Sequence, residues 1–556
     1  MAAFPKPRKL AAALLGAAAL IGASPSLLAQ VVAVAPQPAA APQSAAQPMP
    51  AAKQQADAYQ KSDPELYGVA KQYFPADDSA VPTKRIFRLT RQQIDTSAAS
   101  LLPDYAPKSI KTFMPKDALQ TNYEFAEILN FNPANVGGLS GWVNDITARV
   151  QKNPNGVVNC AAGAAADCAK TAVRAFVVKA FRGDVSEEKI ARIVDFYLNG
   201  VRNAGANQAA ADLVEVVLKS PNFLFRSELD VSRTGRLAPA QLLQAVTYTI
   251  ADAPPEKVNL QSGLASQYLR TGTEAFATIN EIVRSPAARE KLMRFFTAWL
   301  EIKEPGDFTI SQAIFPEFDA KMNAAMLDET KQFLTTQLNK PTPSLKDLTQ
   351  ATPTLASAKP GNPAQRMGVL SMPAVVASHS GPTNTRPIKR GVFWARKVMC
   401  MELEPPPPGT STDVKETPGM TERQRIEELT KGKACIGCHK IINPFAFFQE
   451  NYDALGRWRT TDNGSPIDAS IMIDFLDEDP VKTMGPVDGI KTLTSSMMFK
   501  QCFVRQLFRF YMGRKEDASD DPLLRRMFFE FAYKDRQDIL GAVQTLTSSD
   551  RIVRRQ

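Results

Sequence analysis

The stretch Cys435-Ile436-Gly437-Cys438-His439 decides how the last part of this chain folds, because its residue types and spacing belong to one kind of site. Two cysteines separated by two residues and followed at once by a histidine form the pattern that attaches a c-type haem. In that arrangement Cys435 and Cys438 carry the thioether bonds and His439 binds the iron from one side. The chain has two histidines in all, so a histidine directly behind this pair is a poor candidate for a chance match. The motif predicts one covalently attached haem c.

Two other uses of a Cys-x-x-Cys pair stay open at this point. A structural zinc ion needs four Cys or His ligands, and no second pair follows at a usable spacing. A redox dithiol is the other alternative, because the same spacing serves disulfide exchange. The adjoining histidine favours haem over both.

The second ring nitrogen of His439 needs a hydrogen-bond acceptor to fix its tautomer. Asn443-Pro444 follows directly, which is typical of a backbone carbonyl held for that purpose. The apolar run 444–448 is expected to shield the haem from water, and a dry pocket raises the reduction potential.

The sixth iron ligand separates an electron-transfer haem from one with an open site for chemistry. His379 is the other histidine, and its Ser and Gly neighbours place it on a loop, where it is the candidate distal ligand. Met472 and Met484 are the alternatives, in a loop-rich region after His439. An open or water-bound iron is the remaining arrangement, in which His379 could act as an acid or base. The alternative for His379 itself is a loop histidine bonded to backbone.

A second cluster follows at Arg457, Trp458 and Arg459. The forked guanidinium groups suit the carboxylates of the haem propionates, and the indole N–H is a further donor. The cluster therefore predicts cofactor contacts. The alternative is a solvated turn with one packed tryptophan.

The amino terminus has the composition of a secretory signal over residues 1–29, with three basic residues before a short apolar stretch. An uncleaved anchor is the alternative. Residues 30–80 are predicted to be a disordered tether, since 30–58 is rich in Ala, Pro and Gln. Export to the periplasm agrees with the haem motif.

The net charge of +9 is mild for 556 residues, and the basic residues form no long run. Nucleic acid is therefore not an expected partner. A moderately basic surface suits docking to an acidic redox partner protein.

Apolar residues recur at helical spacing through most of the chain and strand-like alternation is scarce, so the fold is predicted to be mainly α. We expect several helical modules followed by a carboxy-terminal haem module that resembles cytochrome c. Helices are expected over 421–431 and 499–511, with one starting at Ser186. The predicted divisions are an N-terminal helical domain (81–235), a middle helical domain (236–375), a connecting loop with a proline stretch (376–409) and the haem module (410–556).

Four cysteines lie outside the motif. Cys160 and Cys168 bracket a short loop and predict a local disulfide in an oxidising compartment. Cys400 and Cys502 either pair across the carboxy-terminal half or remain buried thiols.

The sequence resembles the planctomycete-type cytochrome c modules found in planctomycetes and myxobacteria. The most specific part is residues 435–445, continuing to Glu450-Asn451-Tyr452-Asp453-Ala454-Leu455-Gly456-Arg457-Trp458-Arg459. Asn443 stands where the family has Asp, and Ala446 where it has Gly. Looser matches cover residues 87–91, 220–226, 315–319, 379–391 and 503–514.

The resemblance implies an exported c-type haem protein and leaves its substrate or partner open. An electron-transfer protein is favoured over a catalyst. The alternatives are a haem enzyme of the peroxidase or oxygenase kind, with an open distal side, and a structural or relay subunit of a membrane-associated redox complex.

Overall fold

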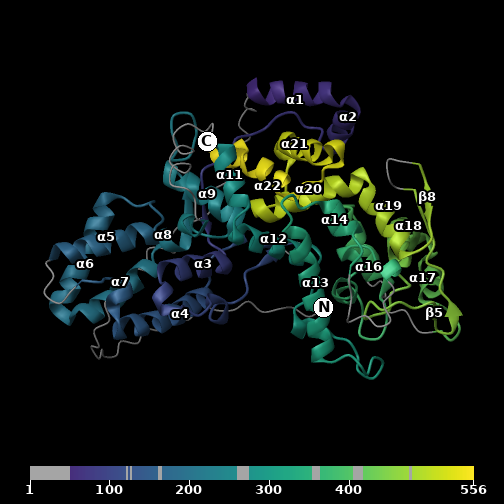
Figure 1. The fold of residues 1–556 in the computed structure, drawn as a ribbon, viewed down its shortest axis with the longest axis horizontal. Coiled ribbons are helices and arrows are strands. Elements are labelled where there is room, and N and C mark those ends of the chain that lie inside the picture. Colours follow the sequence, from purple (N-terminus) through teal and green to yellow (C-terminus); the bar gives the residue numbers. More distant parts are fainter. Residues whose placement is uncertain are drawn as a thin grey trace, which may run out of the picture. The chain divides into compact units, whose positions relative to one another are not determined.

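The computed structural model describes residues 50–120, 123–124, 128–160, 166–258, 275–353, 363–404, 417–474 and 479–556 (Figure 1). The predicted signal segment 1–29, the first part of the predicted tether and most of the 404–409 proline stretch lie outside these ranges.

The described chain is mainly helical, as the sequence predicts. Its α-helices are α1 (Pro50–Ser62), α2 (Pro64–Tyr73), α3 (Arg91–Leu101), α4 (Pro133–Lys152), α5 (Ala166–Ala180), α6 (Glu187–Ala204), α7 (Ala206–Leu218), α8 (Pro221–Leu224), α9 (Pro239–Ala251), α11 (Ala275–Val283), α12 (Pro286–Trp299), α13 (Ala320–Leu338), α14 (Leu345–Gln350), α15 (Pro373–Ser378), α16 (Pro387–Phe393), α17 (Glu422–Thr430), α18 (Lys433–Phe447), α19 (Pro486–Ser495), α20 (Met497–Met512), α21 (Asp521–Ala532), α22 (Ile539–Thr547) and α23 (Asp550–Val553). A short π-helix, η10 (Trp394–Val398), follows α16. None of the helices in the described ranges is long and apolar enough to cross a bilayer.

The strands are short and form antiparallel pairs. They are β1 (Arg85–Arg88) with β4 (Phe225–Glu228), β2 (Leu119–Gln120) with β3 (Tyr123–Glu124), β5 (Thr461–Asp462) with β6 (Ser465–Pro466), and β7 (Ile471–Ile473) with β8 (Val481–Thr483). In the last pair, Ile471 lies opposite Thr483 and Met472 opposite Lys482.

Side-chain caps explain where several helices begin. Ser186 accepts a hydrogen bond from the backbone N–H of Lys189 and starts α6 at the predicted position. Thr421 and Gln424 form a capping box at the start of α17. This helix ends at Thr430, and α18 begins separately after Gly432.

Two large cores organise the described residues. One joins α3 to α8, and apart from Tyr248 its buried members run from Leu89 to Leu224. Within it, α5, α6 and α7 pack side by side (Figure 1). The other draws on residues from Leu66 to Val553. The predicted middle domain and haem module therefore share one core.

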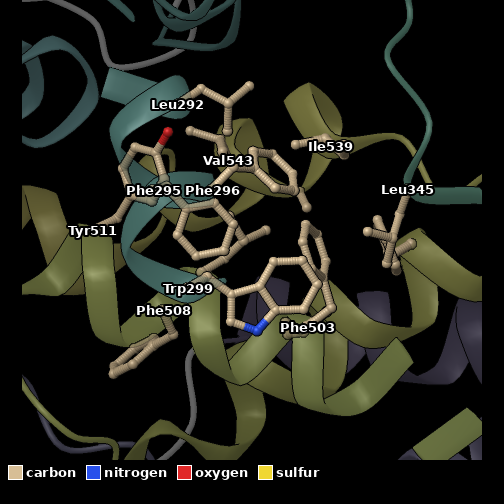
Figure 2. Packing of buried hydrophobic residues seen from close by; sticks show 14 of the residues in the cluster. Leu292, Phe295, Phe296, Trp299, Leu345, Phe503, Phe508, Tyr511, Ile539 and Val543 are labelled. Carbon is tan, nitrogen blue, oxygen red and sulfur yellow. The ribbon is translucent and has the colours of Figure 1, made fainter. Parts of the chain in front are cut away.

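Aromatic rings fill the centre of this larger core, where α12 packs against the carboxy-terminal helices (Figure 2). Trp299 stacks on Phe295, with ring centroids 5.9 Å apart, and meets Phe503 edge-on at 5.4 Å. Large buried rings supply much apolar contact area, so α12 and α20 are held firmly together. The predicted helix over 499–511 is the central part of α20.

The prediction of a disordered tether is wrong for its second half, since α1 and α2 occupy residues 50–73. Leu66, Ala70 and Phe74 are buried in the larger core, and Tyr59 stacks on Phe529 at 4.5 Å. Four apolar residues at helical spacing are enough to dock these helices, although the composition upstream is that of a linker.

Both pairs of cysteines outside the motif form disulfides. Cys160 and Cys168 are joined as predicted, with Cα atoms 6.1 Å apart. Cys400 and Cys502, which the sequence leaves open, are also joined, with Cα atoms 5.2 Å apart. This second bond links the segment before the Cys-x-x-Cys-His motif to α20.

Candidate functional site

The Cys-x-x-Cys-His motif forms the first turns of α18. Cys435, Cys438 and His439 are three and four residues apart, so they lie on one face of the helix. All three are partly exposed, and neither cysteine is in a disulfide. The motif thus offers two free thiols and an imidazole at the protein surface.

A chain of hydrogen bonds fixes the His439 ring. Nδ1 of His439 lies 2.9 Å from Oδ1 of Asn443, one helical turn further along. Nδ2 of Asn443 donates to Oγ1 of Thr430 at 3.1 Å, and that hydroxyl donates to the Ile426 carbonyl at 2.7 Å.

The direction of these bonds determines the tautomer. Because the amide nitrogen of Asn443 is the donor to Thr430, its oxygen faces the imidazole and accepts from it. Nδ1 of His439 therefore carries the hydrogen, and Nε2 keeps the lone pair that a metal needs. The acceptor is the Asn443 side chain, where the sequence indicates a backbone carbonyl near the same residue. The four-residue spacing on a helix is the signal for it.

The second half of α18 anchors the helix in the larger core. Phe445, Phe447 and Phe448 are buried, and Trp394 of η10 meets Phe448 edge-on at 4.9 Å. On another side α16 approaches so closely that a Cβ added to Gly391 would come 2.6 Å from the Ile442 carbonyl oxygen. The motif is therefore carried on a firmly packed helix.

His379, the candidate distal ligand, is buried at the end of α15 with 3% of its surface exposed. Its Nε2 lies 3.0 Å from the Leu300 carbonyl oxygen, and its ring stacks on Phe393 with centroids 3.8 Å apart. Burial lowers the pKa of His379 to about 3, and the nearby Lys389 and Arg390 act in the same direction. The imidazole is neutral and its N–H at Nε2 is used by the protein itself.

Met472 and Met484, the alternative ligands, have half or more of their surface exposed, at 50% and 68%. Met472 lies on the exposed face of β7. Its neighbours Ile471 and Ile473, on the opposite face, are buried in the larger core beside α18. Neither methionine packs into the cores, so both side chains are free to reorient.

The predicted propionate contacts, Arg457, Trp458 and Arg459, lie on a turn after α18. Arg457 donates to Asp453 at 2.7 Å. Arg459 donates to Asp462 at 2.6 Å and to Glu450 at 3.0 Å.

Trp458 packs edge-on against Tyr452, with ring centroids 5.8 Å apart. In the described residues both guanidinium groups are therefore engaged by carboxylates of the protein. This arrangement corresponds to the alternative of a turn with one packed tryptophan. The binding of haem propionates by Arg457 and Arg459 stays a prediction.

The sequence gives no sign of a buried polar cluster behind this turn. Arg390, 1% exposed, donates to the carbonyl oxygens of Tyr452 at 2.8 Å and Asp453 at 2.7 Å and to the Ser380 hydroxyl at 2.7 Å. Burial raises the pKa of the nearby Glu450, an effect that Arg459 and Arg390 oppose. The cluster ties the His379 loop to the segment after α18, and no local pattern separates a buried arginine from a surface one.

The donor set on α18 fits a covalently bound c-type haem. Two free thiols flank one turn of helix, and the adjoining imidazole has its Nδ1 occupied and its Nε2 without a partner among the described residues. This is the combination that thioether attachment and iron ligation need.

Three family models match successive parts of the chain. PSD5, described as a protein of unknown function (DUF1595), matches residues 168–228, and PSD4, described likewise (DUF1592), matches residues 237–360. PSCyt3, a protein of unknown function (DUF1588), matches residues 366–462, which include the motif on α18. No curated protein and no solved structure matches the chain. The PSD and PSCyt names are those of the planctomycete-type cytochrome modules that the sequence resembles, and none of the three modules has an assigned function.

Proposed function

We propose that this chain is an exported, single-haem c-type cytochrome that transfers electrons to or from a redox partner protein. One observation carries the proposal. The two free thiols and His439 share a face of α18, and Asn443 holds the imidazole in the tautomer that leaves Nε2 for iron. The PSCyt3 match over the same residues supports it.

Each residue of the motif would have its own role in holding the haem. Cys435 and Cys438 would hold the haem through thioether bonds, and His439 would be the proximal ligand. Once bound, the group supplies one-electron redox chemistry. Each hydrogen bond from Asn443 to Thr430 has one direction only, so the Asn443 amide keeps its orientation. Its oxygen then holds Nδ1 of the imidazole in place.

For the distal side, the contacts of the described residues favour Met472 or Met484 over His379. His379 would have to give up its hydrogen bond to Leu300 and its stacking on Phe393 to reach a metal. The two exposed methionines lose no core contact when they move.

Export is supported by the two disulfides, which form and persist in oxidising compartments. The same compartment is where a bacterial c-type haem is attached. The signal segment over residues 1–29 remains part of the proposal.

The first test is covalent attachment. Purified mature protein is denatured and assayed as its pyridine haemochrome, which should give one haem per chain. Replacing Cys435 and Cys438 together by Ser should abolish the pigment, and replacing His439 by Ala should leave little correctly ligated haem. The matched control replaces Cys160 and Cys168 by Ser, which should leave the pigment in place. A colourless wild-type protein would overturn the proposal.

The second test is ligand access. An electron-transfer haem with two protein ligands should be low-spin when oxidised and should resist carbon monoxide when reduced. Rapid carbon monoxide binding would instead support the haem-enzyme alternative with an open distal side.

A further inference from the structure

A second concave site lies away from the haem motif. It is a cavity of about 610 Å³ bounded by β1, the start of α3, β3, α9, α12 and the end of α20. These elements come from the N-terminal helical region, the middle region and the carboxy-terminal helices, so the cavity sits where three parts of the chain meet. Ligand sites occur preferentially at such junctions, with volumes of about 300–1,000 Å³.

The wall of this cleft carries more positive than negative charge. Eight Lys and Arg side chains line it, against six Asp and Glu side chains. Both signs are present, with a surplus of two positive charges, and a net positive cleft attracts anions. The charge balance therefore points to an anion.

The most ordered part of the wall is centred on Asp252, at the left-handed carboxy-terminal cap of α9. Its carboxylate accepts from Lys291 at 2.7 Å, from Arg294 at 2.8 Å and from Gln93 at 2.9 Å. Burial acts to raise the pKa of Asp252, and the two cations outweigh it, so the pKa is lowered and the group is ionised. Two cations facing one carboxylate leave a surplus positive charge, and Arg294 is the more exposed of them.

Glu124 lines the same cleft from β3, and its side chain makes no hydrogen bond or ion pair with another described residue. Burial raises its pKa to about 7, with a further contribution from the charges of Asp117 and Asp252, while Arg91 and Lys111 oppose the shift. In its uncharged form this carboxyl group is a donor as well as an acceptor. It can therefore share its proton with an anionic oxygen of a ligand.

Part of the remaining wall is apolar and open, beside polar side chains such as Thr297 and Glu301. Phe510 at the end of α20 and Met293 on α12 are partly exposed, and Leu119 is 59% exposed. Leaving such groups in water is unfavourable, at about 25 cal/mol per Å² of apolar surface. A ligand with an apolar body as well as a charged end would cover them, whereas a bare inorganic ion would not.

We propose that this cleft binds a small organic anion, a carboxylate with an apolar or aromatic body. Arg294 and Lys291 would meet the carboxylate, Glu124 would donate to it, and Phe510 with Met293 would cover the body. The inference does not rest on the haem motif and would hold for the chain with or without its cofactor.

The test uses two probes that share a ring and differ in charge. Fluorine-19 NMR line broadening is measured for 4-fluorobenzoate and 4-fluorobenzamidine, each titrated with the full mature protein at pH 6.5. We expect the benzoate to bind at a single site and the benzamidine to show no binding there. Arg294→Gln, which removes one charge but keeps a donor for Asp252, should weaken benzoate binding about tenfold, as the loss of one charged hydrogen bond implies.

Two controls keep the result interpretable. Arg192→Gln, on the exposed face of α6, should bind benzoate like wild type. If Arg294→Gln does not fold, the exposed rim pair Lys111→Gln with Lys116→Gln serves in its place and should also weaken binding. Equal binding of the two probes, or wild-type affinity in the charge-removing variant that folds, would overturn the proposal.

Discussion

His379 gives the sharpest quantitative prediction, because burial lowers its pKa strongly although the Glu301 carboxylate lies 4.0 Å from its Nδ1. The ring is 3% exposed, stacks on Phe393 and donates to the Leu300 carbonyl, and burial lowers its pKa from 6.5 to about 3. In the unfolded chain His379 is protonated near pH 6.5, whereas in the folded protein it is protonated only near pH 3. The unfolded state therefore binds more protons between these values, and stability falls as the pH falls.

The size of the effect follows from the two pKa values. The contribution to the free energy of unfolding is intact above about pH 7, is reduced by about 2 kcal/mol at pH 5, and is reduced by about 4 kcal/mol at pH 3, at 1.36 kcal/mol per pH unit. A loss of 2 kcal/mol is a large part of the stability of an ordinary domain.

The matched variant is His379→Gln. Its side-chain amide N–H can still donate to the Leu300 carbonyl, but it does not titrate. Urea unfolding of both proteins at pH 7, 6 and 5 isolates the effect, because the carboxylates and His439 are common to both and cancel in the difference. We expect the stability of wild type relative to the variant to fall by about 2 kcal/mol from pH 7 to pH 5.

Two outcomes would refute this reasoning. A difference that stays constant within about 0.5 kcal/mol, the scale of the extrapolation error, would mean that His379 is free to take up a proton in the folded protein. A changed visible spectrum in His379→Gln would mean that the imidazole is an iron ligand and does not hold the position it has here.

Three further predictions concern the surroundings of the motif. Asn443→Asp should lower the reduction potential by about 60 mV in a spectroelectrochemical titration, because a charged acceptor strengthens the His439 hydrogen bond by about 1.4 kcal/mol and favours ferric iron. The control variant Asn443→Leu should not lower the potential. Equal potentials in wild type and both variants would contradict the hydrogen-bond network around His439. Replacing Cys400 and Cys502 by Ala should cost up to about 5 kcal/mol in urea unfolding, since the bond closes a loop of sequence separation 102. The amino-terminal disulfide, with separation 8, is the control and should cost about 2.5 kcal/mol, so equal losses would contradict the loop-closure argument. Gly391→Ala should cost about 1–3 kcal/mol of stability by forcing α16 away from α18, and an unchanged melting temperature would show that the contact yields.

The sequence was most informative where the cause of a structure is local. Ser186 starts α6 because its hydroxyl caps a backbone N–H three residues on. Cys160 pairs with Cys168 across a short loop. The spacing of the motif puts its three side chains on one helical face whatever the rest of the chain does.

Contacts between residues that lie far apart in the chain could not be predicted from the sequence. His379 is held by Leu300, 79 residues earlier in the chain, and Cys400 is joined to a cysteine 102 residues later. Arg457 and Arg459 have the composition of a propionate site, yet acids of the protein engage them, and one of these, Glu317, lies 140 residues before Arg457. Residue type determines which groups a side chain can bind, and the fold determines which of these groups lie close enough to bind it.

The two halves of α18 explain how one helix can be both exposed and rigid. Pro444 stands at the boundary and has no N–H, so it makes no helical hydrogen bond to the carbonyl of Lys440. Beyond it, Phe445 and Phe448 are fully buried in the larger core, whereas before it the motif lies at the surface. Asn443, next to the boundary, ties the exposed half to Thr430 of α17. Under the proposed function, His439 would then be accessible to a partner protein and held in one orientation, which is the fixed ligand geometry that electron exchange with little rearrangement requires.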